Sequence, residues 1–354
     1  MMTMKIKFKK STCLLPKLLM IGLFLSLSIA QSGCDSSKAK ETIDDGNSVI
    51  NDPPRRELSY GKLGLNAFAN DGRFGSMSDQ FNDVKRTLKL KFIRILIAWD
   101  NNVQPTPSDA PNFNFTDSIV AAIPDGLEAL AVVTGAPSWM SSSANWVDGN
   151  PRKTFIERFF RLAVNRYGNN PRLRAFQIWN EPNMIEDPDN GVMSFEDPTN
   201  YLEMAALGAN VVRERAPGKL AVSAATTAIN QNFPQSLNYN KQLVSGGILS
   251  LVDIFAVHYY GKQLENVVRP GGVRDFLRSI SKPIWVTESG RQGYNQQLDY
   301  AERIWPYLFE QIPGIARLYI YQHTDHSPAE VSYGLRNLTA GKDKSDLYIK
   351  LRDR

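Results

Sequence analysis

Residues 177–183 read Gln-Ile-Trp-Asn-Glu-Pro-Asn, and residues 284–289 read Ile-Trp-Val-Thr-Glu-Ser. Each segment is an apolar run that ends in a glutamate, Glu181 in the first and Glu288 in the second. Burial of an ionised carboxylate beside apolar surface costs free energy, so it is expected where a site uses the charge. The two segments therefore indicate a paired-carboxylate site at the ends of two buried strands.

Six further apolar runs precede, separate or follow these two segments. Their continuous β-branched and aromatic composition is typical of strands buried on both faces of a parallel sheet. We expect strands at residues 63–68, 92–99, 129–134, 174–180, 220–225, 252–258, 284–288 and 316–322.

Helical patterns separate the runs, near residues 81–88, 116–122, 156–167, 201–212, 300–308 and 346–354. Ser78 is the expected cap of the first helix, Gly168 stops the third, and Pro306 is expected to kink the fifth. Eight strand–helix units within residues 60–354 predict an α/β fold, a single (β/α)8 TIM barrel without a second domain.

The N-terminal residues 1–33 have the pattern of a secretory signal. Five lysines and no acidic residue are followed by an apolar run at 18–30, which is too short to predict a membrane-spanning helix. The sequence Ser-Ile-Ala-Gln-Ser-Gly-Cys at 28–34 resembles a bacterial lipobox, although Gln31 stands where leucine is usual. The resemblance implies a lipidated Cys34; the alternative is an ordinary cleavage nearby that leaves Cys34 as a spare thiol.

Residues 34–59 are rich in Asp, Ser, Lys, Asn and Pro, and we expect them to form a disordered tether. From the signal and the lipobox we expect an exported protein that is anchored to a membrane, in the periplasm or at the cell surface. Without the anchor it would be secreted. Because the other cysteine, Cys13, lies in the signal, the mature domain has no internal disulfide.

The basic pI comes largely from the signal. Without its five lysines, the 41 lysines and arginines of the chain fall to 36, equal to the 36 aspartates and glutamates. The charge balance therefore gives no sign of a nucleic-acid partner.

Polar and aromatic residues gather where the predicted strands end, which is where barrel enzymes build their active sites. They include Asn66, Arg94, Trp99, Trp139, Asn180, Glu181, His258, Tyr260, Glu288 and Gln322. This distribution predicts a sugar-binding cleft with aromatic platforms. The chemistry that most needs two carboxyl groups there is glycoside cleavage, in which one donates a proton and the other attacks or activates water.

Asn180-Glu181-Pro182 on the fourth predicted strand and Glu288 on the seventh resemble the clan A glycoside hydrolases. The phrase Trp-Asn-Glu-Pro-Asn, with Val-His-Tyr-Tyr at 257–260, is similar to the cellulase-type and β-xylosidase-type families 5 and 39. The resemblance extends from Tyr60 to the C-terminus. It implies a retaining enzyme that cleaves β-linked oligo- or polysaccharides by double displacement.

By this resemblance, Glu181 would be the acid/base and Glu288 the nucleophile. Asn180 would hold the 2-hydroxyl of the sugar at the cleavage point. Arg94 and Tyr260 would orient Glu288 and keep it ionised, because a neighbouring positive charge lowers the pKa of a carboxyl group. The alternative for Arg94 is a buried ion pair with a purely structural role.

Other side chains are expected to contact the sugar, namely His258, Trp139, Trp99 and Asn66. Trp139 could equally serve only for packing, and Trp179 and Trp285 are expected to pack. The clan usually has tryptophan at the end of the eighth strand, whereas this chain has Tyr321, with His323 two residues later. Tyr321 or His323 would take its place beneath the sugar.

The cluster His323-Thr324-Asp325-His326 invites comparison with a metal site, but no fourth ligand has a recognisable spacing. Because retaining glycosidases need no metal, we expect no metal and no cofactor. The enzyme is expected to be a monomer.

Three alternatives remain open on sequence grounds. The enzyme could be exo-acting or endo-acting, which loop lengths would decide. It could be a transglycosylase that uses the same residues. It could also be a glycan-binding surface lipoprotein that lost activity, although binding alone does not need both Glu181 and Glu288.

The lipid anchor can be tested with Cys34→Ala in the full-length chain. We expect this variant to leave the membrane fraction, because it lacks the thiol that carries the lipid. Immunoblotting of soluble and membrane fractions measures the change. Continued membrane attachment of the variant would contradict the predicted anchor.

Overall fold

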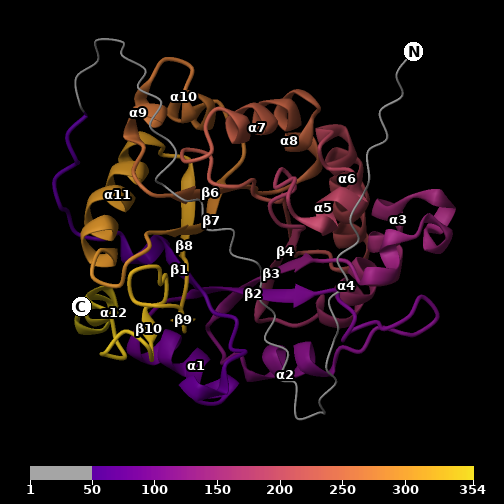
Figure 1. Ribbon diagram of the computed structural model, residues 1–354, viewed down its shortest axis with the longest axis horizontal. Coiled ribbons are helices and arrows are strands. Elements are labelled where there is room, and N and C mark those ends of the chain that lie inside the picture. Colours follow the sequence, from indigo (N-terminus) through magenta and orange to yellow (C-terminus); the bar gives the residue numbers. More distant parts are fainter. Residues whose placement is uncertain (1–49) are drawn as a thin grey trace, which may run out of the picture. The chain divides into compact units, whose positions relative to one another are not determined.

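The computed structural model describes residues 50–354, and its centre is a sheet of eight parallel strands (Figure 1). The strands run in the order β5-β4-β3-β2-β1-β8-β7-β6, and a parallel bridge between Val222 and Ile254 joins the two ends. Their bounds are β1 Leu63–Asn66, β2 Phe92–Ala98, β3 Glu128–Thr134, β4 Leu173–Ile178, β5 Leu220–Val222, β6 Phe255–Tyr260, β7 Ile284–Gly290 and β8 Ile315–Ile320. The predicted (β/α)8 barrel is confirmed.

All eight predicted runs form strands, and the differences lie at their ends. The strand predicted at 252–258 begins only at Phe255, because Val252 and Asp253 belong to the turn before it and the Asp253 carboxylate accepts the Ala221 N–H. The strand predicted at 174–180 ends at Ile178, because Trp179 has a left-handed backbone with φ of 75°.

Apolar side chains fill the interior of the barrel, where large residues alternate with small ones. Trp285 and Tyr319 pack there with six further buried residues, namely Leu130, Ala175, Val222, Ala225, Ile254 and Ala256. Gly64 of β1 leaves the space that the Tyr319 ring fills, since a Cβ on Gly64 would lie 2.7 Å from Tyr319 Cδ1. The opposite faces of the strands pack against the helices in a second, larger core.

The first helix begins two residues earlier than its predicted cap. Ser76 caps α1 (Met77–Asn82): its Oγ accepts the Asp79 N–H, and the Asp79 carboxylate accepts the Ser76 N–H. Ser78 lies inside α1, so the prediction of Ser78 as the cap was wrong. The reciprocal pair of bonds explains the choice, because only Ser76 has an acidic residue three positions ahead to complete the capping box. A π-type turn, Asp83–Thr87, continues α1.

The other helices cover the outside of the barrel between successive strands (Figure 1). Gly168 follows the end of α4 as predicted, and Pro306 lies inside α11. Their bounds are α2 Asn114–Ala122, α3 Pro151–Phe155, α4 Arg161–Tyr167, α5 Pro188–Met193, α6 Pro198–Arg215, α7 Gln235–Ser245, α8 Ile248–Leu251, α9 Leu264–Val268, α10 Val273–Arg278, α11 Gln297–Gln311 and α12 Asp346–Asp353. Two short strands, β9 Thr324–Asp325 and β10 Arg336–Asn337, pair in the loop after β8.

Part of the predicted tether is packed on the barrel. The Arg56 N–H donates to the Glu302 carbonyl of α11, the Arg55 side chain pairs with the Glu302 carboxylate, and Leu58 is buried. The prediction of disorder through residue 59 was therefore wrong for this segment, because Leu58 and the paired arginines give it contacts on α11. The signal, Cys34 and the tether up to residue 49 lie outside the described residues. Within residues 50–354, no helix is long and apolar enough to span a membrane.

Gly64→Ala tests the packing of the barrel interior. The added methyl group would meet both Tyr319 and the Phe92 Cβ at 2.9 Å or less, so we expect the free energy of unfolding to fall by about 1–3 kcal/mol. Urea denaturation measures the change. Gly61→Ala is the matched control, because a Cβ there has no atom within 4 Å. An unchanged midpoint for Gly64→Ala would contradict the proposed packing constraint.

Candidate active site

Glu181 and Glu288 lie together at the C-terminal end of the barrel. Glu288 belongs to β7, and Glu181 follows β4 by three residues. One carboxylate oxygen of each glutamate and a ring nitrogen of His258 all lie within 4.8 Å of one another. Among the described residues, this trio is the one group whose side chains could jointly hold a metal ion. The sequence separated the two glutamates by 107 positions, and the fold brings them into one site.

An extra residue in β7 turns Glu288 toward the site. In the pairing of β7 with β6, Val286 lies opposite Val257 and Glu288 lies opposite His258. Between these two pairs β7 therefore contains one residue more than β6. The register between β7 and β8 shifts at the same place. Trp285 faces the barrel interior, so strict alternation would turn Glu288 toward the helices. The bulge at Thr287 instead places Glu288 on the interior side.

Glu181 stands in a strained turn. Its φ is 44° and that of Trp179 is 75°, in the left-handed region that residues with a Cβ rarely adopt. The Glu181 N–H donates to the Ala225 carbonyl, while the Asn190 Nδ2 donates to the Glu181 carbonyl. Trp179 Nε1 in turn donates to Asn190 Oδ1. The turn is thus held from both sides, as strained backbone at functional sites requires.

Two donors hold the Glu288 carboxylate. Arg94 Nη1 lies 2.6 Å from its Oε1, and the Tyr260 hydroxyl donates to Oε2 at 2.7 Å. Burial alone would raise the pKa of Glu288, but the charges of His258 and Arg94 and the Tyr260 hydrogen bond outweigh it and lower the pKa below 4.5. Burial also raises the pKa of Tyr260 well above its usual value, so its hydroxyl stays a donor. Glu288 is therefore ionised at neutral pH.

Four of the five N–H donors of Arg94 have side-chain acceptors. Besides Glu288, it donates to Gln177 Oε1 at 2.9 Å, to Asn66 Oδ1 at 2.9 Å and to Asn180 Oδ1 at 2.7 Å. The alternative for Arg94 was a buried ion pair with a purely structural role. Arg94 does form a buried ion pair, and its partner is Glu288. Since the guanidinium is nearly buried, it serves the carboxylate and is not free to bind a sugar.

Asn66 was predicted to contact substrate, and its position does not fit that role. It is fully buried, and its Nδ2 donates to the Thr287 and Ile320 carbonyls while its Oδ1 accepts from Arg94. The last residue of β1 therefore positions Arg94 and the bulged part of β7.

His258 lies between the two glutamates. Its Nδ1 is 2.8 Å from Glu181 Oε1, and its Nε2 is 3.5 Å from Glu288 Oε1. The ring is fully buried in β6. Nδ1 shares a hydrogen bond with Glu181, whereas Nε2 lies near Glu288 without a hydrogen-bond partner among the described residues, so the ring stands between the two acids.

Tyr321 follows β8 and packs with Tyr260 and Tyr333 in a cluster of three mutually perpendicular rings. The ring centroids are 5.3–6.0 Å apart, and Phe68 of the β1 loop lies 6.2 Å from Tyr321. Tyr321 and Tyr333 are both partly exposed. No role was predicted for Tyr333, because it lies in an irregular loop whose path no periodicity reveals.

Trp99 was predicted to contact substrate but lies fully buried among the helices. Its ring stacks on Phe159 at 5.5 Å and meets Trp139 edge-on at 5.3 Å. The reason is the two-residue alternation of β2: Arg94 points into the barrel, so Ile97 and Trp99 point outward. Trp139 is half-buried, and its Nε1 donates to the Gln104 carbonyl. Trp179 and Trp285 are both buried, as predicted.

The residues at 323–326 are committed to other contacts. His323 Nε2 lies 2.9 Å from Asp83 Oδ2. Asp325 accepts bonds from the backbone N–H groups of His326, Ser327 and Tyr333 and from two serine hydroxyls. These contacts hold the loop after β8 in place. Because this loop carries Tyr333, Asp325 also helps to position Tyr333 in the tyrosine cluster.

Comparisons with known proteins bear on the family and the fold. A sequence profile described as Cellulase (glycosyl hydrolase family 5) matches residues 61–319. No curated protein sequence matches the chain.

Among solved structures, a family 39 glycoside hydrolase from Bacteroides cellulosilyticus WH2 superposes with a TM-score of 0.59 at 17% identity, covering 84% of this chain and 63% of that one. This chain thus spans less than two thirds of that protein. A monomeric β-xylosidase from Caulobacter crescentus CB15 gives 0.58 at 16% identity, covering 86% and 69%. A GH5_18 protein from Bifidobacterium longum subsp. infantis gives 0.56 at 15% identity, covering 83% and 79%. At these identities the likeness shows the shared barrel fold.

Arg94→Met tests the buried ion pair. It would leave Glu288 charged, buried and without its closest cation, so we expect the free energy of unfolding at pH 7 to fall by about 3–5 kcal/mol. Because the folded pKa of Glu288 lies below 4.5, the pair stabilises the fold above that pH, and its contribution is lost as the pH falls through the folded pKa. The difference between variant and wild type should therefore shrink toward pH 4.

Urea denaturation at pH 7 and pH 4 measures this difference. Arg166→Met is the matched control: it breaks an exposed pair with Asp117, which should cost at most about 1 kcal/mol. An equal loss for both variants at pH 7 would contradict the role of Arg94.

Proposed function

The chain belongs to the cellulase family, glycosyl hydrolase family 5, and from that membership we propose that it is a retaining hydrolase of β-linked oligo- or polysaccharides. The single observation that supports retention is the separation of the two acids. Oxygens of Glu181 and Glu288 lie within 4.8 Å. Retaining enzymes have carboxyl groups about 5–5.5 Å apart, whereas inverting enzymes need about 6.5–9.5 Å to admit a water between them.

In the first step, a Glu288 oxygen attacks the anomeric carbon while Glu181 gives a proton to the departing oxygen. The carbon–oxygen bond to the leaving group breaks as the bond to Glu288 forms. Glu288 suits attack because its pKa is lowered and two donors fix its orientation. In the second step, Glu181 takes a proton from water, the water oxygen bonds to the anomeric carbon, and Glu288 leaves.

Asn180 is the proposed partner of the sugar's 2-hydroxyl. Its Oδ1 accepts from Arg94 Nη2, which fixes the orientation of the amide and leaves the Nδ2 hydrogens as donors. Tyr321 takes the position at the end of β8 where the clan usually has tryptophan. Its partly exposed ring is the proposed platform beneath the sugar.

The proposal extends to the setting of the enzyme. The signal and Cys34 support export and a lipid anchor at the periplasmic or outer surface of a membrane, with the barrel acting as a monomer. The β-linkage has support from one structurally similar protein, which is named as a β-xylosidase. Hydrolysis is favoured over glycan binding alone, because binding needs no pair of facing acids in a strained, pre-positioned geometry.

Glu288→Gln and Glu181→Gln test the two roles in residues 50–354. Glu288→Gln should lower kcat/KM on a 4-nitrophenyl β-glycoside by on the order of 10³-fold or more, because it removes the nucleophile. Glu181→Gln should mainly lower kcat, by about 10²-fold or more, because 4-nitrophenolate departs without a proton whereas the attack of water in the second step needs the base. Wild type is first screened on aryl β-glycosides, β-glucan, xylan and mannan. Full activity in Glu288→Gln would end the nucleophile assignment.

Azide rescue then separates the roles, with Ala at each position to make room for the anion. With azide, Glu288→Ala should form a glycosyl azide of inverted configuration, because azide replaces the missing nucleophile. Glu181→Ala should form a glycosyl azide of retained configuration, because azide replaces water in the second step. NMR of the products assigns the configuration. The opposite assignment would exchange the two roles, and inverted products from wild type would refute retention.

A further inference from the structure

Asn190 lies outside the catalytic pair, yet its side chain binds the backbone of the turn that carries Glu181. It belongs to α5, the short helix after this turn, and is only 2% exposed. Its Nδ2 donates to the Glu181 carbonyl at 2.9 Å and to the Met184 carbonyl at 2.8 Å. The Met184 N–H closes the turn by donating to the Glu181 carbonyl at 3.0 Å. One amide of α5 therefore holds both ends of the turn 181–184.

The amide of Asn190 is fixed in one orientation. Trp179 Nε1 donates to Asn190 Oδ1 at 2.8 Å, so the amide oxygen faces the indole and the N–H groups face the two carbonyls. The indole is itself held by packing, since its centroid lies 5.0 Å from that of Phe155 and 5.5 Å from that of Phe195, both edge-on. The direction of the two donors thus follows from the packing of a buried aromatic ring.

Glu181 has a local tendency to leave its conformation. Its φ of 44° lies in the left-handed region, which residues with a Cβ disfavour. Pro182 follows, and a proline ring favours an extended backbone at the residue before it. Contacts from two other segments oppose this tendency: the Ala225 carbonyl accepts the Glu181 N–H, and Asn190 donates to the Glu181 carbonyl. The contact from Asn190 comes from a side chain, so one substitution can remove it.

The helix that carries Asn190 is anchored independently of Glu181. Asp187 caps α5, because its Oδ1 accepts the Asp189 N–H at 2.9 Å, and Pro188 occupies the first helical position. Asp189 Oδ2 accepts the Ala136 N–H, from the loop after β3, at 3.0 Å. Asn190 therefore acts from a fixed base and does not simply follow the movements of the turn.

The backbone of Glu181 decides where its proton lies. The carboxyl group is bound by His258 Nδ1 at 2.8 Å, and the side chain is 18% exposed, so it is accessible from the site. A change in φ at Glu181 would swing the whole side chain away from this contact. Misplacement of a reacting group by about 1 Å can cost on the order of 10²-fold in rate. The reach of the proton donor therefore depends on the bonds from Asn190.

We propose that Asn190 is a positioning residue for the general acid, and that it thereby sets how poor a leaving group the enzyme can expel. The proposal rests on the proposed function and deepens it, because Glu181 is an acid only if the chain is a glycoside hydrolase. A weakly acidic leaving group needs a proton in the transition state, whereas a strongly acidic phenol departs without one. Loss of the Asn190 bonds should therefore penalise weakly acidic leaving groups selectively.

The test compares phenyl and 2,4-dinitrophenyl β-glycosides of the sugar that wild type prefers, using Asn190→Leu. Leucine is uncharged and of similar size, but it removes both donors. We expect kcat/KM to fall by about 10- to 100-fold on the phenyl substrate and by less than about 3-fold on the dinitrophenyl substrate. The ratio of the two values does not depend on the fraction of folded protein. A merely structural role would lower both values equally, and an unchanged ratio would overturn the proposal.

Gln80→Met is the matched control. Gln80 is another buried carboxamide, and its Nε2 also donates to two backbone carbonyls, those of Asp71 and Gly75, both at 3.0 Å. It holds a turn between β1 and β2, so Gln80→Met should weaken the fold but keep the wild-type ratio. A ratio raised as much as in Asn190→Leu would contradict a specific role of Asn190.

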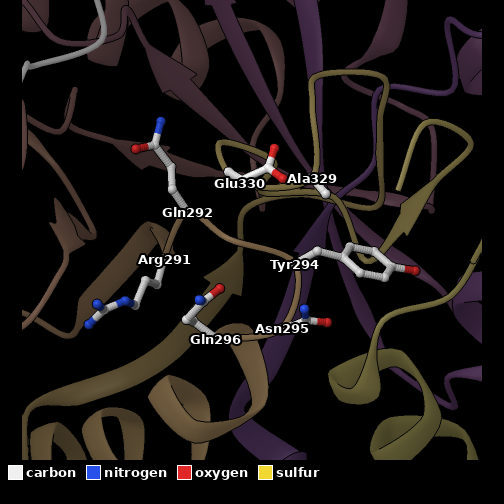
Figure 2. Close-up of a pocket in the computed structure, with 7 residues that line it drawn as sticks. All are labelled: Arg291, Gln292, Tyr294, Asn295, Gln296, Ala329 and Glu330. Carbon is white, nitrogen blue, oxygen red and sulfur yellow. The ribbon is translucent and has the colours of Figure 1, made fainter. Parts of the chain in front are cut away.

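Gln292→Met controls for changes near the nucleophile. Gln292 follows Glu288 by four residues and lines the cavity between the loops after β7 and β8 (Figure 2). A substitution there alters the surroundings of the nucleophile rather than those of the acid, and the two substrates carry the same sugar. The ratio should therefore stay at the wild-type value. A ratio raised as much as in Asn190→Leu would show that it does not report on the acid, and would overturn the proposal.

Trp179→Phe is a second variant, which decides the question if Asn190→Leu does not fold. Phenylalanine retains an aromatic ring for packing but lacks the N–H that orients the Asn190 amide. The amide can then turn over, so we expect the ratio to rise by at least about 3-fold, less than in Asn190→Leu. An unchanged ratio in Trp179→Phe would overturn the proposed orientation of the amide.

A crystal structure of Asn190→Leu gives a result that does not depend on activity. We expect the φ of Glu181 to leave the left-handed region and the 2.8 Å contact with His258 to be lost. If wild type cleaves nothing but the turn relaxes in this way, the positioning of Glu181 stands and the hydrolase proposal fails. If wild type is active but Asn190→Leu keeps both the turn and the ratio, the hydrolase proposal stands and the role of Asn190 fails.

Discussion

The buried contact between Arg94 and Glu288 is the interaction on which the rest of the site depends. The Glu288 side chain is only 11% exposed, so its carboxylate needs a compensating charge, and Arg94 supplies it at 2.6 Å. Arg94 is itself nearly buried, so it needs acceptors for its remaining N–H groups. Asn66 of β1, Gln177 of β4 and Asn180 of the following turn provide them. One ion pair thereby specifies side chains on several strands of the barrel.

Two local distortions then aim the acids at each other. The extra residue in β7 turns Glu288 inward, and the left-handed turn after β4 turns Glu181 toward it. Both distortions are fixed by neighbouring segments: Asn66 bonds the Thr287 carbonyl, and Asn190 bonds the Glu181 carbonyl. The regular barrel supplies rigidity, and the irregular positions supply the direction of the reactive groups.

Much of the architecture could be predicted because its signals are local. Buried parallel strands need continuous apolar runs, and all eight runs form strands. The errors follow from contacts that a sequence pattern does not carry. Ser76 rather than Ser78 caps α1 because Asp79 completes a reciprocal bond, and the segment around Leu58 is ordered because arginines reach α11. Trp99 directly follows a strand, so it was predicted to contact the sugar. Because side chains alternate along β2 and Arg94 points into the barrel, Trp99 points outward.

The sequence by itself determined the barrel, the two glutamates and the strands that carry them, because hydrophobic periodicity and motif spacing are properties of the linear chain. Only the tertiary structure decided that Thr287 forms a bulge, that His258 lies between the two acids, that Asn66 serves Arg94 rather than a sugar, and that Tyr333 joins Tyr260 and Tyr321. The physical reason is that these features depend on register, side-chain direction and loop path. Those are settled by packing between segments far apart in the chain.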